Sequence, residues 1–316
     1  APAAASSSDE AEPEAYNAGG VVIGDIADFD PSQGREYIMI EEEVPVVSAF
    51  SFLKNAWIDE GRPGVESMIV EPQTSARAAG RACNPHVVND QLSVPTSGGS
   101  INVYVAKTTN TVAFLVQSGR TLSSTVLNNL ASSWDSTIYP TMTTYYGKDY
   151  SDGRGLAPPD VDNNCQVQIV IYDIDGAYNI GGYFAPSLAN AREAVYVDYA
   201  DITLSWGKSI LAHEMEHLLH NAQDPYENLW IDEGNADVAI YLCFGADSTL
   251  VSHLNQWTAS SELSVRWWNQ RFADYGAGFI FTMYLADHLG GGPTVRQLVQ
   301  DSATGGLGVE NLALSP

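Results

Sequence analysis

The chain has 316 residues, of which 45% are hydrophobic, so it is long enough to bury a sizeable core and to form two domains. It carries 39 acidic side chains against 14 basic ones, which gives a formal net charge of −25 at pH 7. This charge disfavours nucleic acid and anionic lipid surfaces as partners. The sequence has no run of about 18 apolar residues, so it predicts no membrane-spanning helix.

Residues 1–20 are rich in Ala, Ser, Glu and Pro and lack the apolar stretch of a signal peptide. The chain also begins with Ala1 instead of Met. We interpret residues 1–20 as a processed, extended leader and expect a secreted protein.

Three cysteines allow one disulfide and one free thiol. Cys83 and Cys165 are the expected pair, and Cys243 lies in an apolar helical stretch as a small buried side chain. The alternative is three reduced cysteines. Because the sequence has no C-x-x-C, it excludes a zinc site built from cysteines.

Residues 21–119 predict a β-rich domain. Strand-like runs occupy 37–40, 101–105 and 111–116, and the last two are expected to form a hairpin. The sequence assigns no function to this region.

Residues 120–316 alternate between helical and strand patterns. Apolar residues at helical spacing predict a long helix ending at Pro140, followed by a loop at 147–164. Strands are expected at 167–172 and 193–198, with a loop beginning at residue 181 between them. Further helices are predicted over 209–220, from residue 233 to about 244, from residue 275, and over 294–300. The fold class is therefore α+β, with the β-rich domain first.

The loop at 147–164 contains a candidate calcium site. Asp160-Val161-Asp162-Asn163-Asn164 has the D-x-D-x-N start of a calcium loop, but it lacks the Gly and the distal Glu of an EF-hand. Asp160 and Asp162 are the expected ligands. The alternative is a solvated acidic loop.

The most informative stretch is His213-Glu214-Met215-Glu216-His217, which has the H-E-x-x-H form. On a helix, His213 and His217 are i and i+4 neighbours on one face, about 5–6 Å apart at their Cβ atoms, so both imidazoles can reach one Zn²⁺ ion. Glu214 is then directed toward what that ion binds. The alternative is an accidental spacing on an amphipathic helix.

A catalytic zinc needs a third protein ligand and an open position. The metzincin continuation fails, because residue 223 is Gln where it requires His. His220 is a candidate, but it lies near the expected helix end, where a histidine often contacts exposed carbonyls. We favour Glu233, because Asp237 follows it at i+4 and can accept the second N–H of a ligand histidine. The alternative for Glu233 and Asp237 is an exposed acidic first turn.

A further motif, Tyr275-Gly276-Ala277-Gly278, resembles the Tyr-x-x-Gly helix start of the aminopeptidase N type of glutamate zincins. This resemblance implies that Tyr275 stabilises an oxyanion, for which its protonated hydroxyl is suited. The alternative is a tyrosine that only packs. No Gly-x-Met-x-Asn lies upstream, which departs from the aminopeptidase pattern and favours an endopeptidase.

Taken together, the motifs between residues 160 and 291 resemble the hyicolysin family of secreted bacterial neutral metallopeptidases. They are D-V-D-N-N, G-G-Y-F, Y-V-D, H-E-M-E-H, D-E-G-x-A-D and Y-x-x-G. The resemblance implies a zincin-type catalytic domain with a thermolysin-like core at 120–316, one catalytic Zn²⁺, and protein or peptide substrates. In zincins an edge strand commonly precedes the zinc helix, and we expect 193–198 to be that strand.

The sequence therefore predicts a monomeric, secreted zinc endopeptidase in which Glu214 acts as general base. A protein that keeps the zincin shell for binding or adhesion is the alternative. A Ser-His-Asp hydrolase ranks last, because no G-x-S-x-G is present.

Overall fold

The computed structural model describes residues 47–48, 50, 54, 83–150, 154–176, 179–260 and 262–314. The statements below concern these residues. The expected leader at 1–20 and the strand expected at 37–40 lie outside them.

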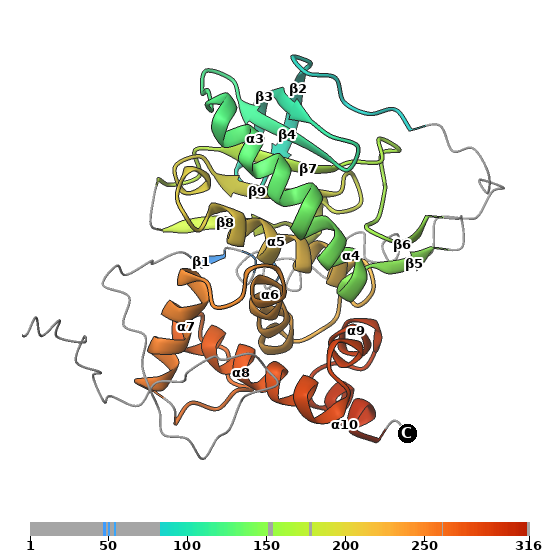
Figure 1. The fold of residues 1–316 in the computed structure, drawn as a ribbon, viewed down its shortest axis with the longest axis vertical. Coiled ribbons are helices and arrows are strands. Elements are labelled where there is room, and N and C mark those ends of the chain that lie inside the picture. Colours follow the sequence, from blue (N-terminus) through green and yellow to red (C-terminus); the bar gives the residue numbers. More distant parts are fainter. Residues whose placement is uncertain are drawn as a thin grey trace, which may run out of the picture.

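One mixed sheet contains seven of the described strands, in the order β1-β8-β9-β7-β4-β3-β2 (Figure 1). Strands β2, β3 and β4 form antiparallel pairs, β4, β7 and β9 run parallel, and β8 returns antiparallel to β9. The strands are β1 (Val47–Ser48), β2 (Gln91–Thr96), β3 (Gly99–Thr108), β4 (Val112–Gln117), β7 (Val167–Tyr172), β8 (Ile180–Phe184) and β9 (Ala194–Asp198). The predicted hairpin is present as β3–β4.

This sheet crosses the domain boundary expected after residue 119. Strand β4 pairs directly with β7, so the described strands on either side of the boundary share one sheet. Most of residues 1–82 lie outside the described part of the chain. The division into 1–20, 21–119 and 120–316 therefore stays a prediction.

The strand expected at the sheet edge is an interior strand. β9 lies between β7 and β8, because β8 adds antiparallel to it. Residues 181–184 were expected to begin a loop, but they form most of β8. The expectation was wrong because Gly181 and Gly182 carry no side-chain signal for a strand, although Gly182 is needed there for close packing.

A nearly continuous helical segment crosses one face of the sheet. It consists of α3 (Ser124–Ser133), a π-helical turn η2 (Trp134–Ile138) and α4 (Tyr139–Tyr146). The helix was expected to end at Pro140, but Pro140 lies in the first turn of α4. The π-helical turn directly before α4 marks where the regular α-helical hydrogen bonding is interrupted.

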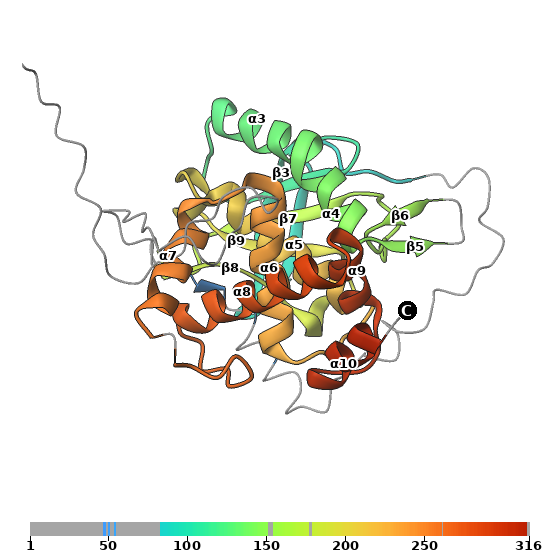
Figure 2. The ribbon, with the colours of Figure 1, turned by 60° about the horizontal axis from the view of Figure 1, so that its bottom comes forward.

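Of the remaining helices, α5 lies between the sheet and α6, and the helices that follow it form the lower part of Figure 1, which comes forward in Figure 2. Helices α7 and α10 were not predicted, and the hairpin of β5 (Lys148–Tyr150) and β6 (Gly155–Ala157) lies in the expected loop. The helices are α5 (Gly207–Asn221), α6 (Leu229–Phe244), α7 (Ser248–Thr258), α8 (Phe272–Leu289), α9 (Gly292–Gln300) and α10 (Gly306–Leu314). The α+β fold class is confirmed.

The main core lies between the sheet and the helices. Alternate residues of β4, such as Phe114 and Val116, point to this face, whereas Ala113 and Leu115 belong to a smaller cluster on the opposite face. Helix α5 is buried along almost its whole length. It is therefore an interior element held from all sides, as a rigid metal site requires.

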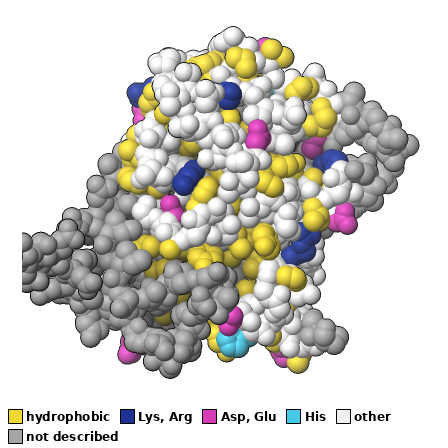
Figure 3. Space-filling model, viewed as in Figure 1, with side chains coloured by type: hydrophobic (Ala, Val, Ile, Leu, Met, Phe, Trp, Pro, Cys, Tyr) yellow, Lys and Arg dark blue, Asp and Glu magenta, His cyan; other side chains and the backbone are white. Residues whose placement is uncertain are grey.

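On the face drawn in Figure 3, the Lys, Arg, Asp and Glu side chains are scattered singly among hydrophobic side chains, other side chains and backbone. Among the described residues, no helix combines the length and the apolar character needed to cross a bilayer.

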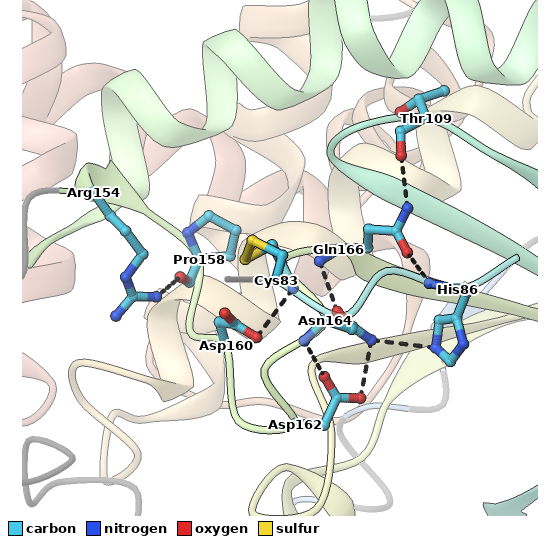
Figure 4. The surroundings of a disulfide bond; sticks show 10 residues. Cys83, His86, Thr109, Arg154, Pro158, Asp160, Asp162, Asn164 and Gln166 are labelled. Atoms are coloured by element: carbon cyan, nitrogen blue, oxygen red, sulfur yellow. Dashed lines mark hydrogen bonds between the residues drawn. A yellow bond between two sulfur atoms is a disulfide. The ribbon is translucent and has the colours of Figure 1, made fainter. Parts of the chain in front are cut away.

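The predicted disulfide is present. Cys83 and Cys165 are bonded with their Cα atoms 5.6 Å apart, and they join the irregular segment before β2 to the loop before β7 (Figure 4). Beside this link, the Asn84 N–H donates to the Asn163 carbonyl at 3.0 Å. The disulfide is thus part of a local anchor for the loop that contains Asp160 and Asp162.

Reducing this disulfide is expected to lower the free energy of unfolding by about 2–5 kcal/mol, because it closes a long loop in the unfolded chain. The sequence separation is 82 residues. Chemical denaturation with and without a reductant measures the effect. The same reductant should leave a Cys165→Ser variant unchanged, and an equal loss of stability in that variant would contradict the assignment.

Candidate metal centre

Three side chains from two packed helices converge below the sheet. His213 and His217 lie one turn apart on α5, with ring centroids 4.8 Å apart, and Glu233 lies in the first turns of α6. Glu233 Oε2 is 3.2 Å from His213 Nε2 and 3.4 Å from His217 Nε2. All three side chains are buried. One ligand atom from each residue lies within 4.8 Å of the others.

Carboxylates hold the opposite side of each imidazole ring. His213 Nδ1 is 3.3 Å from Asp237 Oδ1, and His217 Nδ1 is 3.2 Å from Asp232 Oδ1. A carboxylate oxygen therefore faces each Nδ1, which leaves each Nε2 directed toward Glu233. This is how outer carboxylates orient metal-ligating histidines.

The three ligands fit a zinc ion. Tetrahedral Zn²⁺ with bonds of about 2.0–2.2 Å requires neighbouring ligand atoms to lie roughly 3.4 Å apart. The separations from Glu233 Oε2 match this requirement. Apart from Glu233 Oε2 at 3.4 Å, the buried His217 Nε2 faces no hydrogen-bond partner among the described residues. A metal ion would supply the missing partner.

The electrostatics of the site favour a bound cation. Burial lowers the pKa of His213, but hydrogen bonds with Asp237 and Glu233 outweigh burial and raise this pKa to about 9. Burial raises the pKa of Asp237, yet His253 and His213 reverse this and lower it to about 2. The carboxylates thus stabilise positive charge at the centre of the site.

Glu214, the residue after His213 on α5, packs against Gly182 of β8. It is 1% exposed, and a Cβ added to Gly182 would be 3.3 Å from Glu214 Cγ and 2.7 Å from Ile210 Cγ2. A larger residue at position 182 would push α5 away from the sheet. Gly182 therefore fixes how closely Glu214 approaches β8.

Tyr275 approaches the site from α8. Its ring centroid is 6.0 Å from that of His213, and it is enclosed by His253 and Trp268, each with a centroid 4.8 Å away. Tyr275 is 1% exposed.

Two glycines bring α8 against α6. A Cβ on Gly234 would be 2.8 Å from the backbone of Gly278, so the two helix backbones are in direct contact. Helix α6 holds Glu233 and α8 holds Tyr275. This close contact sets the distance between the two side chains.

Sequence reasoning missed several partners. Asp232 contacts His217, His253 Nδ1 lies 2.7 Å from Asp237 Oδ2, and Glu216 Oε2 lies 3.4 Å from His217 Nδ1. Asp232 is adjacent to Glu233 in the sequence, so its position gave a weak signal. Nothing in the sequence pattern singled out His253.

Two residues from the N-terminal part of the chain also lie at the site. The Phe50 ring stacks on His217 with centroids 3.7 Å apart, and Lys54 forms a buried ion pair with Asp232. Both side chains are buried. Neither was predicted, because they are more than 150 positions from the motif.

His220, the weaker candidate for the third ligand, is not part of this group. Its Nδ1 lies 3.0 Å from Glu216 Oε1 and 3.3 Å from Asp232 Oδ1. His220 instead groups with Asp224 and Glu227.

The calcium candidates Asp160 and Asp162 lie together with Glu193, which the sequence analysis did not include. Asp162 accepts hydrogen bonds from the Asn164 N–H at 3.1 Å and from Gln168 Nε2 at 2.6 Å, and Figure 4 shows the loop beside the disulfide. Glu193 is 2% exposed, and its Oε1 has no hydrogen-bond partner in the described structure.

The architecture is that expected of a thermolysin-like fold, and the buried His213, His217 and Glu233 fit the H-E-x-x-H plus Glu zinc site of that class. Among curated proteins, the chain is similar to the neutral metalloprotease ShpI of Staphylococcus hyicus, at 26% identity over 278 residues. This similarity is distant, but it confirms the resemblance drawn from the motifs. The alignment covers 75% of the chain and spans 60% of the relative's length. No model of a known family matches the chain.

Proposed function

We propose that the protein is a secreted, zinc-dependent endopeptidase that acts on proteins or peptides. The observation that carries this proposal is the convergence of His213, His217 and Glu233 with zinc-ligand spacing, each histidine oriented by a carboxylate. Similarity to a protein named as a neutral metalloprotease supports the same reaction class.

In this proposal His213, His217 and Glu233 hold Zn²⁺. When bound, the ion lowers the pKa of a water ligand toward about 7 and polarises the scissile carbonyl. Glu214 takes a proton from the attacking water and delivers it to the leaving amine. Tyr275 donates a hydrogen bond to the developing oxyanion. Asp237 and Asp232 keep the ligand histidines in the required tautomer and orientation.

The burial of the site favours the alternative function, a binding protein without catalytic activity. His213, Glu214 and Tyr275 are at most 5% exposed, so a substrate reaches them only after the protein that covers them moves. This burial is the observation that favours a catalytically silent binding protein with a zincin shell.

Casein hydrolysis separates the two functions. The purified full chain should cleave casein, lose the activity in 1,10-phenanthroline, and regain it when Zn²⁺ is restored. A chain that binds zinc stoichiometrically and shows no cleavage under any of these conditions would support the silent binding protein instead.

We also propose a calcium ion at Asp160, Asp162 and Glu193. Burial, and next the negative charge of the neighbouring Asp162, raise the pKa of Glu193 to about 9, because no cation is present to offset a charge on its carboxylate. A Ca²⁺ ion would neutralise the carboxylates and accept the buried Glu193 Oε1 as a ligand.

Millimolar Ca²⁺ is accordingly expected to raise the melting temperature by roughly 5 °C, through preferential binding to the folded state. The shift should disappear in Glu193→Gln and persist in Glu262→Gln, which changes an exposed glutamate. Equal shifts in both variants would rule this site out.

A further inference from the structure

A second group of metal-ligand residues follows directly after the H-E-x-x-H helix. His220 is in the last turn of α5, and Asp224 and Glu227 lie in the connection to α6. Their exposed fractions are 0%, 2% and 1%. Buried charged groups are expensive unless they are paired or coordinate a metal ion.

Each of the three side chains is held by one of its two polar atoms. His220 Nδ1 faces Glu216 Oε1 at 3.0 Å, which leaves Nε2 as the ring atom available to another partner. Asp224 Oδ1 accepts a hydrogen bond from the Tyr226 N–H at 3.0 Å.

Glu227 is fixed in the same way from two directions. Its Oε1 accepts from the Asn228 N–H at 2.5 Å and from the Gly305 N–H at 2.6 Å, so it links the start of α6 to the segment before α10. The other oxygen, Oε2, is left for a different partner.

The remaining atoms converge. His220 Nε2, Asp224 Oδ2 and Glu227 Oε2 are all buried, and in the described structure none has a hydrogen-bond partner. One ligand atom from each residue lies within 4.8 Å of the others. Three oriented, unpartnered ligand atoms around a common point form the arrangement that a metal ion would complete.

The negative charge around this group also favours a bound cation. His220 lies close to four carboxylates, those of Glu216, Asp224, Glu227 and Asp232. The nearby Lys54 forms its ion pair with Asp232.

We propose that His220, Asp224 and Glu227 bind a second divalent transition-metal ion, distinct from the one at His213, His217 and Glu233. One imidazole and two carboxylates suit Zn²⁺ or Mn²⁺ better than Ca²⁺, which prefers oxygen ligands alone. The ion has a structural role. It ties the end of α5 to the start of α6, and through His220 and Asp232 it supports the orientation of His217.

Metal analysis of the full chain after equilibration with Zn²⁺ and removal of excess tests this site. We expect two zinc ions per chain in the wild type and in Glu262→Gln, and one in Glu227→Gln and in Glu233→Gln. If Glu227→Gln retains as many zinc ions as the wild type, the inference is wrong. Because metal content is the readout, this result is independent of whether the chain cleaves peptides.

Anomalous diffraction from wild-type crystals grown with Zn²⁺ provides a second measurement that needs no variant. A peak bounded by His220 Nε2, Asp224 and Glu227 is expected. Density at His213 and His217 with none at the second group would overturn the inference.

Discussion

A Glu214→Gln variant is expected to bind zinc like the wild type and to cleave casein at least about 10²-fold more slowly. The amide has nearly the same shape as the carboxylate, so packing against Gly182 is preserved. It cannot accept the proton of the attacking water. Rates of casein cleavage, with zinc content measured on the same samples, check this expectation.

The matched control is Glu310→Gln, an exposed glutamate on α10. It should leave both cleavage and zinc content unchanged. Wild-type activity in Glu214→Gln would remove Glu214 from the proposed role, whatever the metal content.

The second large effect is expected for Glu233→Gln. This change removes the negative ligand that faces both His213 Nε2 and His217 Nε2, so we expect the zinc affinity of that site to fall at least about 100-fold and casein cleavage to fall with it. Competition with a chromogenic chelator measures the affinity.

Asp237→Asn provides a graded comparison for this result. Asp237 contacts the ligand His213 from the opposite side, so its loss should weaken zinc binding by about 10–100-fold, less than the loss of Glu233. If Asp237→Asn weakens zinc binding more than Glu233→Gln does, the assignment of Glu233 as the ligand and of Asp237 as the residue that orients His213 is wrong.

Local patterns predicted the centre of the molecule well. The periodicity around His213 and His217 predicted α5, and the β-branched run at 167–172 predicted β7, because both are buried elements with regular apolar spacing. The i and i+4 spacing of Glu233 and Asp237 also placed both carboxylates on the side of α6 that faces α5.

Other features depend on contacts between distant segments, and local patterns do not encode those. β8 contains two glycines, which have a low propensity for strands. Gly182 is needed there because it allows α5 to pack closely against β8. Glu193 joins Asp160 and Asp162 only because β9 lies beside β7. The contacts of Phe50 and Lys54 with His217 and Asp232 likewise arise from the fold.

The sheet shows the same limit at a larger scale. Hairpin β3–β4 was predictable, since its strands are adjacent in the sequence. The parallel pairing of β4 with β7 spans the π-helical turn and two helices, and no local signal specifies it. For that reason nothing in the sequence indicated that the described strands on the two sides of residue 119 share one sheet.

The most direct test of the account is the position of zinc in a crystal of the purified chain, measured by anomalous scattering at the zinc absorption edge. We predict a peak about 2.0–2.2 Å from His213 Nε2, His217 Nε2 and a Glu233 carboxylate oxygen, with one coordination position open to water or substrate. A zinc-loaded protein with no peak between these three side chains, or with a fourth protein ligand closing that position, would contradict the proposed peptidase.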